Sequence, residues 1–361
     1  MFRPAIARYL PLRQLNVRLR KFSDESFKVT SKFKVSLSEV TSDKSLSTFV
    51  LSKCLDEDKR NQIALVNGFT EKSYTNGELY ERTYKFAKAL SQMGLQHGDC
   101  IAIVSPNDSD YFPAFVGASV IGCVSTPVNP LYTTEEIEYQ VNMTSAKAVV
   151  VHHCCLQQVQ AMATSRGLQI ITIGSDAASP LSNEPRFPSL EEMVASVTDE
   201  VGPDSFPAVH PDSPLTIPFS SGTTGLPKGV VLSHRNVTSN MLQIKVVEGD
   251  VWGKKLLNPL PFFHIYGLVV GLVYPVFIGV CSVFMPAFDF VQCLELIQKH
   301  RITTLALVPP IVLALAKHPL VDKYDLTSLQ RIGCGAAPLG SEIQRTAANR
   351  LKCIVKQGNC C

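Results

Sequence analysis

The sequence feature that most limits the possible fold is the run Pro218–Val230, which contains glycines, hydroxyl side chains and one lysine in a particular order. It follows the apolar segment Leu215–Ile217, which we expect to be a short buried strand, and it precedes a helix that begins at Ser233 or Asn236. Glycine lets backbone N–H groups turn towards an anion, hydroxyl groups add hydrogen-bond donors, and Lys228 adds a positive charge. The run therefore predicts a phosphate-binding loop between a strand and a helix.

Two other interpretations of this run fit less well. The P-loop of many nucleotide hydrolases needs a glycine directly before its lysine and a serine or threonine directly after it. Here Pro227 precedes Lys228 and Gly229 follows it, so the P-loop is excluded on spacing. A flexible surface linker is the remaining alternative, but a linker does not require this order of hydroxyl, glycine and lysine residues.

Two further segments accompany the run. Pro259–Gly267 reads Pro-Leu-Pro-Phe-Phe-His-Ile-Tyr-Gly, and Gly333–Leu339 reads Gly-Cys-Gly-Ala-Ala-Pro-Leu. In this order and at these separations, the three segments resemble the signatures of the adenylate-forming enzymes, which include acyl-CoA synthetases, 4-coumarate:CoA ligases and firefly luciferase. The resemblance runs from about Ser45 to Gly358 and is strongest to the 4-coumarate and medium-chain acyl-CoA ligases. It implies an α/β fold with two helix-covered, mainly parallel sheets, namely the large N-terminal domain of such an enzyme, incomplete at its C-terminal end.

The resemblance implies a two-step reaction that uses ATP, Mg²⁺ and CoA. A carboxylate oxygen attacks the α-phosphate of ATP and gives an acyl-adenylate and pyrophosphate, and the CoA thiolate then displaces AMP. The protein contributes mainly positioning and charge stabilisation to the first step. The implied substrate is a small carboxylic acid, either aromatic or a medium-chain fatty acid, and the sequence does not choose between them because pocket shape decides.

The resemblance also assigns roles to individual residues. His264 and Lys228 are the implied catalytic residues, with His264 beside the reacting carboxylate, and Thr224 is the implied metal ligand. Without the resemblance, His264 would more commonly be a buried structural histidine. The residues implied to bind ATP are Ser220, Ser221, Gly222, Thr223, Thr224, Gly225, Lys228, Gly335, Ala336, Ala337 and Pro338.

The residues Asn359–Cys361 depart from the family pattern, which continues after Gly358 with an aromatic residue, a glycine and a Thr-Glu pair. By this comparison we expect residues 24–358 to form a partial ligase domain without the magnesium-binding glutamate, the ribose-binding aspartate and the small C-terminal domain with its lysine. Loss of one charge-stabilising group costs about 10²–10³ in rate, so we expect weak or no ligase activity from this chain. The alternatives are a catalytically silent protein that binds ATP and an acyl group, and a non-functional splice product.

The first 23 residues contain several arginines and no acidic residue before Asp24, with apolar residues between the charges. This composition is typical of a mitochondrial transit peptide. Pro4 and Pro11 interrupt any helix here, so a basic, unstructured tail is the alternative, with a cytoplasmic or peroxisomal location.

Composition and charge exclude several other classes. A formal net charge of +3, with both signs interspersed, gives no support for nucleic-acid binding. The cluster His152–Cys155 follows three valines and is better explained as a strand end than as a metal site. The uncharged stretch Ile265–Phe288 is interrupted by Pro275 and by glycines, so we expect a buried helix followed by a strand rather than a membrane span.

The remaining sequence alternates between strand and helix patterns, which indicates parallel sheets covered by helices. Thr75 and Glu78 form a capping box ahead of an amphipathic helix that Gly94 ends. We expect strands at 100–104, 148–151, 169–173, 281–284, 303–308, 331–333 and 353–355, and helices at 109–121, 135–143, 190–196, 266–277, 290–299 and 311–317.

Overall fold

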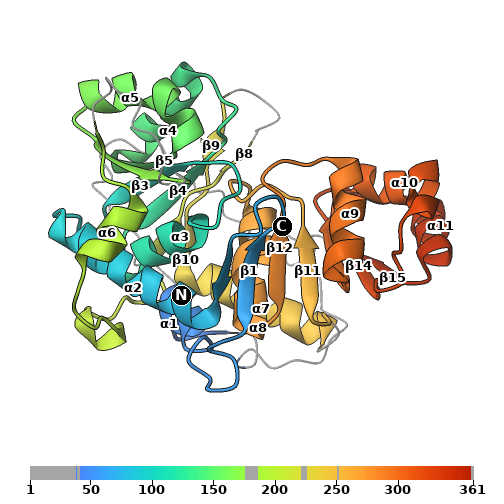
Figure 1. Ribbon diagram of the computed structural model, residues 1–361. Helices are drawn as coiled ribbons and strands as arrows, with labels where there is room; N and C mark the ends of the chain where they lie inside the picture. Colours follow the sequence, from blue (N-terminus) through green and yellow to red (C-terminus); the bar gives the residue numbers. More distant parts are fainter. Residues whose placement is uncertain (1–37, 39–40, 175–185, 221–225, 250–251, 359–361) are drawn as a thin grey trace, which may run out of the picture.

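The computed structural model describes residues 38, 41–174, 186–220, 226–249 and 252–358 (Figure 1). The predicted transit peptide, residues 221–225 of the phosphate-binding run and the tail 359–361 lie outside the described residues. The described part contains a seven-stranded sheet, a six-stranded sheet and a separate two-stranded hairpin. The predicted α/β fold with two mainly parallel, helix-covered sheets is confirmed.

The seven-stranded sheet has the order β15-β14-β13-β11-β12-β1-β2. All neighbouring strands are parallel except β1 and β2. Its strands are β1 (Ile63–Asn67), β2 (Ser73–Thr75), β11 (Lys255–Asn258), β12 (Cys281–Phe284), β13 (Thr304–Leu307), β14 (Arg331–Cys334) and β15 (Ile354–Gln357).

The six-stranded sheet has the order β10-β7-β4-β3-β5-β6, and only β10 runs antiparallel to its neighbour. The hairpin of β8 (Phe219–Ser220) and β9 (Lys228–Gly229) lies between β7 and β10 in the chain. The strands of the sheet are β3 (Cys100–Val104), β4 (Val124–Val128), β5 (Ala146–His152), β6 (Gln169–Ile173), β7 (Pro214–Thr216) and β10 (Leu232–Ser233).

Helices cover both faces of each sheet. Their bounds are α1 (Leu46–Leu51), α2 (Asn76–Gln92), α3 (Tyr111–Val120), α4 (Thr134–Thr144), α5 (Leu156–Ser165), α6 (Leu190–Ser196), α7 (His234–Glu248), α8 (Tyr274–Ile278), α9 (Phe290–His300), α10 (Pro309–Lys317) and α11 (Ser341–Leu351). A π-helix, Gly267–Val273, leads directly into α8. In Figure 1, α9, α10 and α11 lie beside the seven-stranded sheet, while α4 and α5 lie beside the six-stranded sheet.

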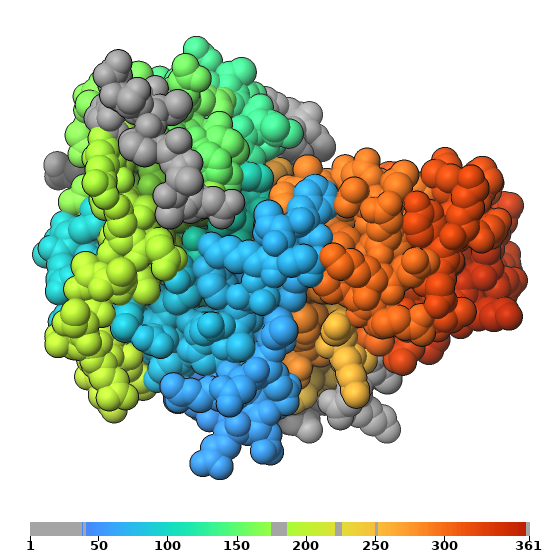
Figure 2. All heavy atoms as spheres, in the orientation of Figure 1, coloured from blue at the N-terminus to red at the C-terminus, as the bar shows by residue number. Residues whose placement is uncertain are grey.

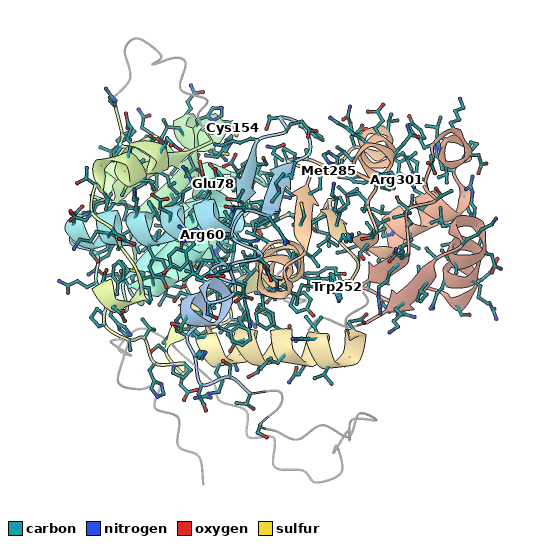
Figure 3. The ribbon with its side chains drawn as sticks, turned by 60° about the horizontal axis from the view of Figure 1, so that its bottom comes forward. Arg60, Glu78, Cys154, Trp252, Met285 and Arg301 are labelled. Carbon is teal, nitrogen blue, oxygen red and sulfur yellow. The ribbon has the colours of Figure 1, made fainter. Side chains whose placement is uncertain are left out.

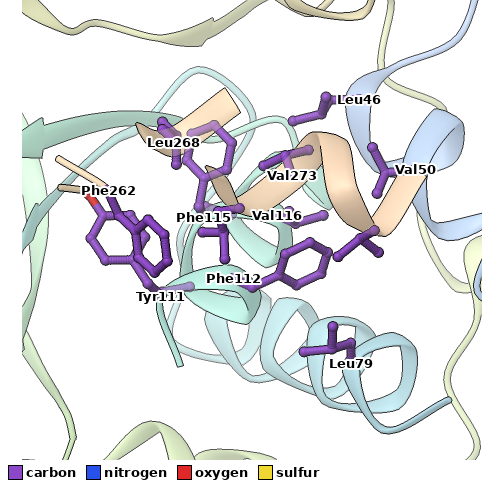
Figure 4. Close-up of a cluster of buried hydrophobic side chains, with 14 of the residues drawn as sticks. Leu46, Val50, Leu79, Tyr111, Phe112, Phe115, Val116, Phe262, Leu268 and Val273 are labelled. Carbon is purple, nitrogen blue, oxygen red and sulfur yellow. The ribbon is translucent and has the colours of Figure 1, made fainter. Parts of the chain in front are cut away.

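Three clusters of buried residues explain this layering. One joins the seven-stranded sheet to α9, α10 and α11, and another joins β3 and β5 to α4 and α5. The third lies between the two sheets and includes α1, α2, α3, the π-helix and α8. Figure 4 shows the centre of this third cluster, where Phe262 lies beside Tyr111. In Figure 2 the residues of α1 and β1 lie between the part of the molecule that contains the six-stranded sheet and the part that contains α9, α10 and α11. Because successive residues of the parallel strands face different clusters, those strands are apolar on both faces.

Local sequence signals account for many element boundaries. The Thr75 and Glu78 capping box is present at the start of α2, and Gly94 beyond its end has a φ of 88°. The predicted strands at 100–104, 169–173 and 281–284 and the helix at 190–196 have the predicted bounds. The cluster at 152–155 marks the end of β5, as predicted.

The prediction needs correction in two respects. The helix expected at 266–277 is wound as a π-helix over its first turns, and several elements were not predicted, among them α1, α11, β1, β2, β4 and β11. The π-helix brings Gly267 so close to the preceding loop that an added Cβ would lie 2.2 Å from the carbonyl oxygen of Pro261. Within the described residues, no helix is long and apolar enough to cross a membrane.

Candidate active site

The phosphate-binding run forms the hairpin of β8 and β9, in which Ser220 pairs with Lys228. Both residues are exposed, and they form the pair next to the connecting loop. Ser221, Gly222, Thr223, Thr224 and Gly225 lie between them, outside the described residues. The structure therefore brings two of the predicted phosphate-binding residues together.

The hairpin is attached to the six-stranded sheet and to α4. The Ile217 N–H donates to the Ser125 carbonyl over 2.8 Å, and the Thr126 hydroxyl donates to the Ile217 carbonyl over 2.9 Å. The Tyr139 hydroxyl donates to the Pro227 carbonyl over 3.3 Å. These bonds hold the base of the hairpin at the carboxyl end of β7, where ligands commonly bind in α/β sheets.

His264 lies in the loop after β11, at the carboxyl edge of the seven-stranded sheet. Its Nδ1 accepts a hydrogen bond from the Tyr266 N–H over 3.2 Å, so the neutral ring carries its proton on Nε2. Desolvation lowers the pKa of His264, although part of the side chain is exposed. The imidazole is therefore neutral at pH 7 and has one N–H available as a donor.

Asn107 fixes this loop and was missed by the sequence analysis. Its side-chain amide donates to the carbonyls of Leu260 and Met285 over 2.8 and 2.9 Å, and its Oδ1 accepts from the Phe262 N–H over 2.6 Å. The residue follows β3 and is only 4% exposed. Its position three residues after the end of the buried strand β3 could have indicated this role, because ligands commonly bind at the carboxyl ends of strands in α/β sheets.

The third segment forms a turn after β14. The Gly335 N–H donates to the Leu307 carbonyl over 3.0 Å, and a Cβ added at Gly335 would lie 3.0 Å from the Tyr266 ring. Glycine therefore lets this turn approach the aromatic residue of the second segment. Ala336 has a φ of 69°, an uncommon conformation for a residue with a side chain. Ala337 and Pro338 are exposed beside it.

A cavity of about 280 Å³ lies between α7 and the strands β13, β14 and β15. Its walls include Tyr266 and Gly333 from the second and third segments, near the carboxyl ends of the strands. Apolar side chains form much of the remaining wall. The lining residues are Asn240, Gln243, Ile244, Val247, Glu248, Trp252, Tyr266, Val270, Thr304, Leu305, Ala306, Arg331, Gly333, Cys334, Lys356, Gln357 and Gly358.

The contacts of the described residues thus join the second and third segments through Tyr266, while the hairpin is attached separately through β4 and α4. Thr224, the predicted metal ligand, lies outside the described residues. Among the residues that the structure describes, no group of three or more His, Cys, Asp or Glu side chains could hold a metal ion.

Comparison with known proteins agrees with this arrangement. The family model of the AMP-binding enzymes matches residues 55–358. The 4-coumarate–CoA ligase 1 of Petroselinum crispum is 38% identical over 286 residues, which cover 78% of this chain and 50% of that ligase. The 4-coumarate–CoA ligase 3 of Arabidopsis thaliana is 38% identical over 302 residues, which cover 81% and 52%. The chain therefore spans about half the length of these relatives.

Solved structures show the same fold. A red-emitting luciferase from Phrixothrix hirtus has a TM-score of 0.77 and 25% identity, over 87% of this chain and 60% of the luciferase. An anthranilate CoA ligase in complex with anthranoyl-AMP has a TM-score of 0.76 at 20% identity, over 88% and 60% of the two chains. The family match over most of the chain identifies it: the chain belongs to the AMP-binding enzymes, the adenylate-forming family of the acid–CoA ligases.

Proposed function

We propose that this chain supplies the ATP- and acid-binding part of an ATP-dependent acid–CoA ligase. In the first step a carboxylate oxygen attacks the α-phosphorus of ATP, and pyrophosphate leaves to give the acyl-adenylate. In the second step the CoA thiolate attacks the acyl carbon and AMP leaves. The proposed substrate is a small carboxylic acid, either aromatic or of medium chain length.

The observation that carries this proposal is the contact between Tyr266 and Gly335 at the cavity beside α7. The resemblance assigns the turn at Gly335 to the adenine and the acyl group, and the segment of Tyr266 to the acyl pocket. An acid in this cavity would therefore have its carboxylate next to the nucleotide. Such closeness is what converts a reaction of two molecules into a favourable step within one complex.

The proposed residue roles come from the resemblance, and the chemistry of each side chain suits them. Lys228 neutralises charge on the β- and γ-phosphates, and Ser220 opposite it donates a hydrogen bond to them. The Nε2–H group of His264 donates a hydrogen bond to an oxygen of the carboxylate or of the α-phosphate. Ala336, Ala337 and Pro338 border the adenine and the acyl group. For the loop residues Ser221, Gly222, Thr223, Thr224 and Gly225, phosphate binding remains a prediction from the resemblance, as does Mg²⁺ binding by Thr224.

The experiment is ATP–pyrophosphate exchange by the purified full chain, with Mg²⁺ and a panel of aromatic and straight-chain acids. Acid-dependent exchange above background would support adenylate formation, and the responding acid would define the substrate class. Absence of exchange from a folded chain that still binds ATP would favour the catalytically silent binding protein. We expect weak exchange, and even weaker formation of the CoA thioester in a parallel assay.

We also propose that residues 1–23 direct the protein to mitochondria. The composition supports this proposal, because arginines alternate with apolar residues and acidic residues are lacking. Fusion of these residues to a fluorescent protein tests it. Mitochondrial fluorescence is the expected result, and diffuse fluorescence would leave a basic tail as the better account.

A further inference from the structure

The cavity beside α7 has two chemically different ends. Gly335 follows the carboxyl end of β14, whereas Arg331 begins the same strand. Gly335 lies four positions after Arg331 along the extended chain, which corresponds to about 13 Å. Trp252 and Glu248 lie at the Arg331 end, and Figure 3 shows Trp252 close to the end of α7. An acid whose carboxylate lies near Gly335 would therefore point its other end towards Arg331.

Charged side chains line this far end in spite of its burial. The guanidinium of Arg331 forms an ion pair with Glu248, and their side chains are only 4% and 20% exposed. The Lys356 ammonium lies 3.9 Å from the same Glu248 carboxylate. Two cations thus share one anion. Desolvation lowers the pKa of Arg331, and desolvation together with the Arg331 charge lowers the pKa of Lys356.

One buried hydrogen-bond donor of the cavity wall has no partner within the described part of the chain. The indole N–H of Trp252 is buried and has no hydrogen-bond partner among the described residues. The cavity lining thus includes the donor side chains of Trp252, Arg331 and Lys356 together with the Glu248 carboxylate, while the amides of Asn240, Gln243 and Gln357 can both donate and accept. A buried donor without a partner is costly, so a ligand that brings acceptor atoms to this point gains binding energy.

We propose that the pocket selects acids with a second carboxylate at the end remote from the reacting one. This inference rests on the proposed function, because it takes the cavity to be the acyl site. A second carboxylate would balance the excess positive charge at Arg331 and Lys356 and would accept the free N–H of Trp252. A plain alkyl or phenyl end would shield these groups from water without replacing its hydrogen bonds, and sites of this kind reject such analogues strongly.

The test compares matched acids by calorimetric titration of the full chain in the presence of ATP. Adipic acid is paired with hexanoic acid, and terephthalic acid with benzoic acid. We expect the dicarboxylic acid of each pair to bind at least about tenfold more tightly, as charge-assisted hydrogen bonds do. Equal affinity, or tighter binding of the monocarboxylic acids, would overturn the proposal.

Variants connect the preference to named side chains. Arg331→Met should remove the preference, but it leaves Glu248 with only the more distant Lys356 as a partner and can impair folding. Lys356→Met changes a side chain that is 47% exposed, and Trp252→Phe removes only the N–H from the wall, so both should fold and each should reduce the preference several-fold. Lys352→Met, on the exposed turn before β15, is the matched control and should keep it.

The two proposals fail in different ways. If monocarboxylic acids bind and support pyrophosphate exchange but second carboxylates bring no advantage, only the selectivity proposal is wrong. The selectivity proposal is also wrong if dicarboxylic acids bind more tightly but Lys356→Met and Trp252→Phe keep this preference unchanged. If no acid binds to a chain that binds ATP, the acyl assignment of the cavity is wrong, and the selectivity proposal is overturned with it.

Discussion

Two parts of the candidate site, the hairpin of β8 and β9 and the loop that carries His264, are attached to the fold by different kinds of contact. The loop is fixed from within, because the buried side chain of Asn107 binds three backbone groups around it. The hairpin has two strands of two residues each, and its paired residues Ser220 and Lys228 are exposed.

The difference indicates that the two regions contribute to the site in different ways. A histidine that must direct one N–H at a reacting atom benefits from a backbone held by buried hydrogen bonds and close packing. A phosphate-binding hairpin can work through exposed charge and hydroxyl groups, whose loss costs little stability. If this account is correct, substitutions around the His264 loop should affect folding first, and substitutions in the hairpin should affect nucleotide binding first.

The largest effect should come from Asn107→Ala. It leaves the Met285 carbonyl and the Phe262 N–H without their buried partner and the Leu260 carbonyl with only the Asn258 amide, so we expect the free energy of unfolding to fall by about 3–5 kcal/mol. Urea denaturation measures this change. Asn129→Ala is the matched control, since Asn129 is less buried and accepts one hydrogen bond from the Leu131 N–H; it should cost under about 1 kcal/mol. Equal costs would show that the buried hydrogen bonds of Asn107 do not fix the His264 loop.

The next largest effect should appear in the pH dependence of stability. His234 begins the helix that follows the hairpin; it is fully buried, and its Nδ1 accepts from the Leu46 N–H over 3.0 Å. Burial lowers its pKa from 6.5 to about 4. The unfolded chain therefore binds the proton more tightly, and stability from the neutral ring is lost as the pH falls from about 6.5 to about 4.

His234→Asn keeps an acceptor for the Leu46 N–H and removes this titration. The stability advantage of the wild type over the variant should shrink by about 3 kcal/mol between pH 7 and pH 4. Denaturation curves at several pH values measure the difference, and contributions from other titrating groups cancel in it. Parallel curves for the two proteins would show that His234 is not a buried neutral histidine.

A smaller effect is expected at Ser233, the residue that links the hairpin region to α7. Its hydroxyl accepts from the Asn236 N–H over 3.1 Å, and the Asn236 side chain accepts from the Ser233 N–H over 2.9 Å. Ser233→Ala should lower the free energy of unfolding by about 1 kcal/mol, and Ser233→Gly by only a few tenths. The reverse order in thermal unfolding would exclude helix capping as the cause.

The smallest effect on stability is expected for Lys228→Met. The side chain is exposed and lies next to the loop of the hairpin, so the free energy of unfolding should change by less than about 0.5 kcal/mol. Chemical denaturation of the variant beside the wild type measures this change. A loss as large as that of Asn107→Ala would mean that the hairpin, too, is held by structural contacts.

The sequence predicted those parts of the molecule whose signals are local. The capping box at Thr75 and Glu78 and the apolar run at 100–104 define α2 and β3, because capping and burial act over a few neighbouring residues. The hairpin and the turn at Gly335 were located through motifs for the same reason. Helix α11 escaped detection because its buried residues are few and its remaining surface is polar.

The parts that sequence could not predict depend on distant contacts. Asn107 acts on Leu260, 153 residues further along the chain, and no pattern around Asn107 specifies that partner. The π-helix at Gly267–Val273 likewise follows from how tightly its glycines pack against Pro261 and the Asn258 side chain. The ion pair of Glu248 and Arg331 joins a helix end to a strand start that are far apart in the sequence.

The most direct test of the division between hairpin and loop is the affinity of the full chain for ATP, measured by calorimetric titration of the wild type and of Lys228→Met. We predict that the variant binds ATP about tenfold to a hundredfold more weakly, as expected for a lost charge-assisted contact, while it unfolds at the wild-type denaturant concentration. Unchanged affinity in a folded variant would contradict the assignment of the hairpin to the phosphates.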